Sequence, residues 1–203
     1  EGVFGYDRRM NAIPGNFLDE RHAQAVRWAA AVIGREPLEF SIASADASFR
    51  RYFRLRRDDG SSWIAMDAPP GQENLGTYLA VTALLESCQV HVPQVLAADT
   101  GRGFALLEDL GDTHMLTALN RGEDPQRLYA QALDTLAGLQ LRGQAASQHL
   151  PPYDHATLLR EMRLLPEWYC TRHLGLTLSD GEQQLLAQTF DWLAQQALQQ
   201  PQV

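Results

Sequence analysis

The sequence predicts an α+β protein in which a five-stranded antiparallel sheet with one helix precedes a run of helices. Two observations lead to this fold class. Residues 38–44 and 48–55 alternate side-chain character with a period of two and are rich in aromatic side chains, as strands are. Later in the chain, leucines such as Leu133, Leu136 and Leu139 instead recur at the spacing of one helical face.

The first half of the chain begins with a helix and continues into the predicted sheet. Asn16 is the expected N-cap of this helix, and Gly34 is its expected end. Five strands with one helix after the third are the element order of a kinase-type N-lobe. The first three predicted strands cover about residues 38–44, 48–55 and 61–70, and the helix covers about residues 74–88. The last two strands cover about residues 93–99 and 103–109.

The second half of the chain is predicted to be helical from residue 113 onward. Pro166 is expected to kink a helix over about residues 156–169. Ser179 and Glu182 have the spacing of a capping box, so another helix should begin there. The two predicted domains are a kinase-like N-lobe with an N-terminal helix, residues 1–110, and a partial helical C-lobe, residues 111–203.

Composition excludes several classes of function. All 17 basic side chains are arginine, so a Walker-type phosphate loop and a Schiff-base enzyme are ruled out, because each needs a lysine. The net charge of −8 argues against a nucleic-acid partner, which would favour a broad basic face. No apolar run reaches membrane length, so we expect no membrane partner and a cytoplasmic location.

Five arginines fall between residues 50 and 57, directly after a turn of small residues. In an extended strand, Arg50 and Arg54 share one face with Ser48 and Tyr52, whereas Arg51 lies on the other. The turn would let backbone N–H groups and the Ser48 hydroxyl approach a phosphate group. An ordinary hairpin turn with arginines on a solvated edge is the alternative, and the pattern alone leaves both open.

Six segments, taken in order, resemble one family. They are DASFRRYFRL, IAMDAPP, VPQVLAAD, GFALLEDLGD, LPPYD and the closing QPQV. The segments are similar to those of bacterial amino-sugar kinases related to aminoglycoside phosphotransferases, and most of all to the anomeric kinases of N-acetylmuramate and N-acetylglucosamine in cell-wall recycling. The resemblance implies a bilobal kinase-like fold that uses ATP with Mg²⁺. It also implies transfer of the γ-phosphoryl group to the C1 hydroxyl of an N-acetylated sugar.

The same resemblance assigns residues to a nucleotide site. Residues 108–110 would form a hinge whose backbone meets adenine, and a merely structural turn in the segment LLEDLG is the alternative. A sugar would lie near the LPPYD segment, for which a simple Pro-Pro turn with a capping aspartate is the alternative. The residues implied are Asp46, Ala47, Ser48, Arg50 and Arg51 for the phosphates, Glu108, Asp109 and Leu110 for the hinge, and Tyr153 and Asp154 for the sugar.

One part of the family pattern is missing. No histidine in the sequence begins the catalytic motif HxDxxxxN. We therefore expect the catalytic base and the metal ligands beyond Val203, and we expect these 203 residues to be inactive alone and to self-associate through an exposed C-lobe face. A kinase for an aminoglycoside or another small alcohol, and a non-catalytic nucleotide-binding module, are the alternative functions.

Overall fold

The computed structural model describes residues 19–34, 39–45 and 48–200. The chain divides into two compact units, residues 1–135 and 136–203, and each is described by itself. Within the described residues, none of the helices combines the length and the apolar character needed to cross a bilayer.

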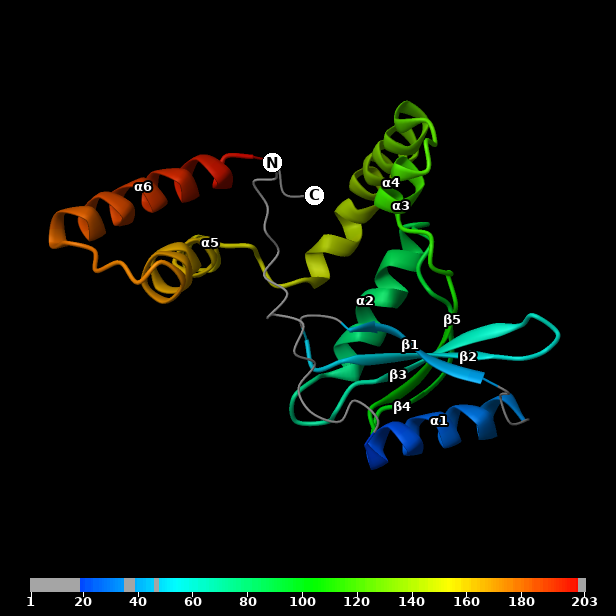
Figure 1. The fold of residues 1–203 in the computed structure, drawn as a ribbon. Helices are drawn as coiled ribbons and strands as arrows, with labels where there is room; N and C mark the ends of the chain where they lie inside the picture. Colours follow the sequence, from blue (N-terminus) through cyan, green and yellow to red (C-terminus); the bar gives the residue numbers. More distant parts are fainter. Residues whose placement is uncertain (1–18, 35–38, 46–47, 201–203) are drawn as a thin grey trace. The chain divides into compact units, whose positions relative to one another are not determined.

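The first unit is built on a five-stranded antiparallel sheet, which confirms the predicted α+β fold class (Figure 1). The strands are hydrogen-bonded in the order β1-β2-β3-β5-β4, so β3 lies at the centre. Each predicted strand is present, and the helix after the third strand is also present. The strands are β1 Glu39–Ala45, β2 Arg51–Arg56, β3 Ser62–Asp67, β4 Val95–Asp99 and β5 Phe104–Glu108.

Helix α1, Glu20–Ile33, covers one face of the sheet (Figure 1). It ends at Gly34 as predicted, in a left-handed conformation that glycine adopts without strain. Its N-cap is Asp19, whose carboxylate accepts a hydrogen bond from the His22 N–H at 2.9 Å. The predicted cap Asn16 lies outside the described residues. The helix therefore begins later than the sequence suggested.

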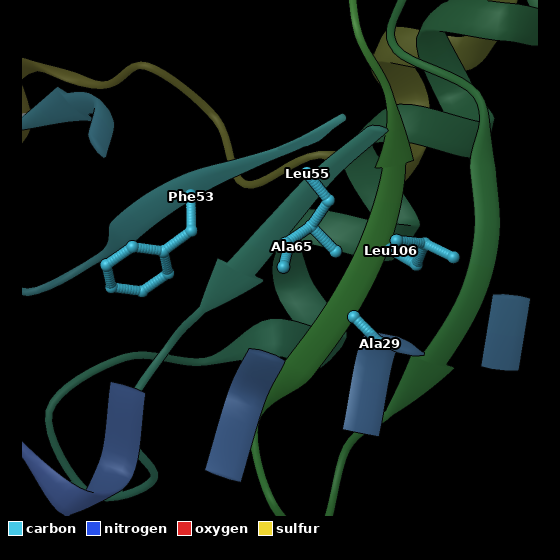
Figure 2. Packing of buried hydrophobic residues seen from close by; sticks show 5 residues of the cluster. All are labelled: Ala29, Phe53, Leu55, Ala65 and Leu106. Atoms are coloured by element: carbon cyan, nitrogen blue, oxygen red, sulfur yellow. The ribbon is translucent and has the colours of Figure 1, made fainter. Parts of the chain in front are cut away.

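The apolar side of α1 packs on alternate residues of the central strands. Figure 2 shows Ala29 of α1 in one buried cluster with Phe53, Leu55, Ala65 and Leu106. All five have at most 2% of their surface exposed. Removing so much apolar surface from water is the main force that holds α1 on the sheet.

Helix α2, Leu75–Ser87, lies on the opposite face of the sheet (Figure 1). Asn74 caps its first turn, accepting a hydrogen bond from the Thr77 N–H at 3.1 Å, and Cys88 ends it, in agreement with the predicted bounds. Leu75 packs on Met66 and Leu107, which alternate with the α1-facing residues of the same strands. The sheet is therefore buried on both faces.

The remaining elements are helical. Helix α4 begins in the first unit and continues into the second. The capping box of Ser179 and Glu182 is confirmed at the start of α6. The helices are α3 Met115–Asn120, α4 Pro125–Ala146, a 3₁₀ turn Ser147–His149, α5 His155–Met162, a π-helix Leu165–His173 and α6 Asp180–Leu198.

The predicted helix over residues 156–169 is instead two elements. Helix α5 ends at Met162, and the π-helix Leu165–His173 follows. Pro166 lies at the start of the π-helix and has no N–H, so it cannot donate the bond that would continue α5. The Thr171 hydroxyl donates to the Pro166 carbonyl at 2.9 Å and stabilises the wider turn.

Gly103, at the turn before β5, is in close contact with the end of β3. A Cβ atom placed there would lie 2.0 Å from the Ala68 carbonyl oxygen, and its φ is +74°. Gly60 has a similar φ of +83° but open space around it. We expect Gly103→Ala to lower the free energy of unfolding by about 1–3 kcal/mol more than Gly60→Ala, since both carry the backbone strain and only one adds a clash. Urea denaturation of the two variants measures this, and equal losses would contradict the close contact.

Candidate functional site

A cavity of about 390 Å³ opens where the chain leaves β5. Ile64 of β3 and Leu107 of β5 give it an apolar wall on the α2 side of the sheet. Residues 108–112 form its rim, and Tyr52 and Tyr78 also line it. All three predicted hinge residues are thus brought together at one apolar cavity. An apolar wall of this kind is suited to a planar heteroaromatic ring.

An ion-pair cluster lies at the rim, and its Arg54–Asp109 pair is buried whereas the Asp112 side chain is 65% exposed. Arg54, in the middle of β2, donates from Nε to Asp109 Oδ2 at 2.7 Å and from Nη2 to Asp109 Oδ1 at 2.8 Å. Its Nη1 bonds to Asp112 Oδ1. Arg54 is 6% exposed, and the Asp109 side chain is 4% exposed. Sequence reasoning placed Arg54 on the polar face of β2 but did not connect it to the hinge.

The electrostatics of this cluster keep both partners charged. Burial alone would raise the pKa of Asp109, but the Arg54 guanidinium and the Gly111 N–H hold that pKa below its usual value. Hydrogen bonds from Arg54 to Asp109 and then Asp112 raise the pKa of the arginine. The rim therefore carries a fixed, fully ionised pair at every physiological pH.

Glu108 begins the rim and is tied to the segment that precedes β4. Its carboxylate accepts the Gln94 N–H at 3.1 Å and lies 3.3 Å from His91 Nε2. The bond from Gln94 is the main reason that the pKa of Glu108 lies below its usual value. The Glu108 side chain thus has a local structural role at the start of the rim.

The two arginines predicted to contact phosphate have different surroundings. Arg50 Nε lies 3.4 Å from Glu73 Oε2. The Arg50 guanidinium lies over the ring of Tyr78, a residue that lines the cavity. Glu73 also accepts the Phe49 N–H at 3.0 Å, so it fixes the end of the β1–β2 connection. Arg50 therefore belongs to the cavity side of the sheet.

Arg51 lies on the α1 side. Its Nη2 donates to Asp67 Oδ2 at 2.6 Å, and its Nη1 donates to Asp19 Oδ2 at 2.9 Å. Burial opposes the charge of Arg51, but these two carboxylates outweigh it and raise its pKa. Arg51 thus connects the first turn of α1 to the end of β3, a role that the sequence pattern did not reveal.

Other predicted site residues are placed as follows. Ser48 Oγ accepts the Arg50 N–H at 3.2 Å, and Asp46 and Ala47 lie outside the described residues. Asp154 caps α5 by accepting the Thr157 N–H at 2.8 Å, and Tyr153 beside it is exposed. Both belong to the second unit.

Ligands for Mg²⁺ were expected outside the chain. Among the residues that the structure describes, no three His, Cys, Asp or Glu side chains gather as a metal ion would require. These residues do not fit a resident metal, and we derive no chemical step through one.

Comparison with known proteins identifies the family of the chain. The model of the phosphotransferase enzyme family matches residues 39–203. An N-acetylmuramate/N-acetylglucosamine kinase of Neisseria meningitidis serogroup B is 41% identical over 91% of the chain and 55% of its own length. Proteins of the same name from Pseudomonas putida and Pseudomonas aeruginosa are 45% and 44% identical, over 80% and 82% of the chain.

The chain spans about half the length of these relatives, since the matches cover 55%, 47% and 48% of them. The family match begins at the first residue of β1, and it includes the sheet, the cavity and all the helices from α2 onward. On this match, the kinase-like fold expected from the sequence is confirmed, and the chain belongs to the phosphotransferase enzyme family.

Proposed function

We propose that the protein is an ATP-dependent kinase that transfers the γ-phosphoryl group to the anomeric hydroxyl of an N-acetylated amino sugar, as part of cell-wall recycling in the cytoplasm. Three relatives named N-acetylmuramate/N-acetylglucosamine kinase support the substrate class. Residues 1–110 would act as the N-lobe that holds the nucleotide, and residues 111–203 would begin the C-lobe.

The cavity at the end of β5 is the observation that carries the proposal. Adenine would lie against Ile64 and Leu107, with its polar edge toward the backbone of residues 108–110. Recognition by backbone groups suits a base, because N–H and C=O groups at a chain reversal present a donor and an acceptor side by side. The rigid Arg54 pair would keep these groups in place without contacting the ligand.

The phosphates would extend toward the β1–β2 connection. Arg50 and Ser48 would then meet them, together with Asp46 and Ala47 through their backbone. Phosphoryl transfer depends mainly on positioning and on neutralising spread negative charge. An arginine can supply both, because its planar guanidinium matches two phosphate oxygens at once. Because these 203 residues contain no lysine, Arg50 would take the place of the usual phosphate-binding ammonium group.

Arg50→Ala should weaken ATP binding by about 1–3 kcal/mol, since one charge-assisted contact is lost. Isothermal titration of ATP into the full-length protein measures this. Arg102→Ala is a matched control, because Arg102 is an exposed arginine on the β4–β5 turn whose partner is Asp99. Equal affinities for the Arg50 variant and the wild type would sink the phosphate role.

The resemblance assigned Arg51 to the phosphates as well, but the effect of Arg51→Ala should differ from that of Arg50→Ala. Its contacts with Asp19 and Asp67 predict a loss of fold stability alongside any loss of affinity.

The identity of the phosphoryl acceptor is tested by assaying the full-length protein with a panel of sugars and aminoglycosides. We expect ATP consumption with N-acetylmuramate and N-acetylglucosamine, and none with 1-deoxy-N-acetylglucosamine, which lacks the C1 hydroxyl. Phosphorus NMR of the product should show a sugar 1-phosphate. Turnover with an aminoglycoside alone would favour the other small-alcohol kinases, and nucleotide binding without any turnover would favour a non-catalytic module.

Self-association remains a prediction for the second unit. Its elements expose large apolar side chains, and the most exposed of those on the π-helix and α6 are Trp168, Tyr169, Leu185 and Trp192.

A further inference from the structure

We propose that Arg54 is a positioning residue for the nucleotide, which sets base affinity by fixing the rim segment 108–112 and makes no contact with phosphate. This inference rests on the proposed function, because it assumes that the cavity takes an adenine nucleotide. It concerns a residue that neither the sequence pattern nor the family resemblance singled out.

The contacts of Arg54 join strand β2 to the rim. All three guanidinium nitrogens are engaged, Nε and Nη2 by Asp109 and Nη1 by Asp112. The arginine is in β2 and its partners follow β5, with β3 between these two strands. The ion pair therefore spans the middle strand and holds the segment that leaves β5 against β2.

The same carboxylate shapes the backbone of the rim. Asp109 Oδ1 accepts the Gly111 N–H at 2.9 Å while it also accepts from Arg54. Gly111 has a φ of +82°, so the chain reverses there. One fixed carboxylate thus sets the direction of the peptide groups on both sides of Leu110. Those peptide groups are the ones that would meet the base.

Burial makes the geometry of the pair demanding. A charged pair at 6% and 4% exposure loses its hydration, and only well-aligned hydrogen bonds offset that loss. Lysine keeps the charge but cannot form the two parallel bonds to Asp109. Arg56 is a natural comparison, because it comes from the same strand and lies 3.6 Å from Asp112, yet it is about half exposed.

A direct phosphate role for Arg54 is the competing interpretation, since the residue lines the cavity. The two carboxylates already balance its charge, which makes it a poor anion site. The two roles differ in one measurable way. A positioning residue affects adenosine and ATP equally, whereas a phosphate ligand affects ATP and spares adenosine.

The test uses Arg54→Lys and the control Arg56→Lys in the full-length protein. Dissociation constants for ATP and for adenosine are measured by calorimetry, together with the melting temperature and with kcat at saturating ATP. We expect Arg54→Lys to weaken both ligands by about tenfold and to the same extent, with kcat and the sugar KM preserved. Arg56→Lys should stay within about twofold of the wild type, because exposed pairs contribute little.

If Arg54→Lys does not fold, the double variant Arg54→Met with Asp109→Leu replaces it, because an apolar pair of similar size is often tolerated where a broken ion pair is not. We then expect the same equal loss of affinity for ATP and for adenosine. A folded variant that keeps wild-type adenosine affinity overturns the inference, whether or not ATP binding falls. A wild-type protein that binds neither adenosine nor ATP overturns the proposed function instead, so the two failures are distinguishable.

Discussion

Asp67→Ala should lower the free energy of unfolding by about 3–5 kcal/mol, because it leaves the partly buried arginine Arg51 without its closest partner. Asp67 ends β3 and has no exposed surface. Arg51 donates a hydrogen bond to Asp67 Oδ2 at 2.6 Å. Arg21 Nη2 forms an ion pair with Asp67 Oδ1 at 2.7 Å. Arg21 and Arg51 come from α1 and β2, so one carboxylate holds three elements together.

The loss should be concentrated at α1. Asp19 caps this helix and also binds Arg51, and hydrogen bonds from Arg51 are the main cause of its lowered pKa. Without Asp67, Arg51 loses the contact that orients it toward Asp19. Hydrogen exchange should therefore show faster opening of Glu20–Ile33 than of β5.

Asp99→Ala is the matched control for this experiment. Asp99 also ends a strand and also faces an arginine, but Arg102 is largely exposed and 3.6 Å away. Its carboxylate also accepts the Arg102 N–H at 2.9 Å, so its removal should lower the free energy of unfolding by about 1 kcal/mol. Guanidinium denaturation of the two variants compares them directly. If Asp67→Ala lowers the free energy of unfolding no more than Asp99→Ala does, the Asp67 carboxylate does not hold α1 on the sheet.

Local patterns in the sequence predicted most of the first unit and the start of α6 in the second. Asn74 before an apolar run, Gly34 after one, and the Ser179–Glu182 spacing each marked a helix end that the structure confirms. These signals act over a few residues, so neighbouring sequence is enough to identify them. The start of α1 and the π-helix at Pro166 were not predicted, because Asn and Asp are similar N-cap residues and a proline in a helical pattern does not distinguish a kink from a wider turn.

The candidate site was predictable in part, for a related reason. Residues 108–110 were identified through resemblance, and the structure brings them to one cavity. Their support was not identified, since Arg54 and Asp109 are 55 residues apart. The alternation of β2 separated Arg50 from Arg51 correctly, but it did not show which face of the sheet carries the cavity. Only the positions of α1 and α2 settle that.

Leu110→Pro should weaken ATP and adenosine binding by about 100-fold, the largest effect on ligand affinity that we expect. Leu110 lies on the rim, and its side chain is largely exposed, so the side chain contributes little to the core. Proline removes the N–H at this position, and a polar atom of the base would then be desolvated without a partner. Proline also restricts the backbone of Asp109, the residue that Arg54 holds.

Leu110→Ala separates the backbone from the side chain, because it trims the same apolar group and keeps the N–H. Its loss of affinity should stay below about tenfold. Melting temperatures of both variants check that the sheet remains folded, and calorimetry with adenosine isolates the base from the phosphates. If the proline variant is folded and binds adenosine as the alanine variant does, the N–H of Leu110 takes no part in recognition. The base would then be held by other groups of the cavity, and the hinge assignment of residues 108–110 would be wrong.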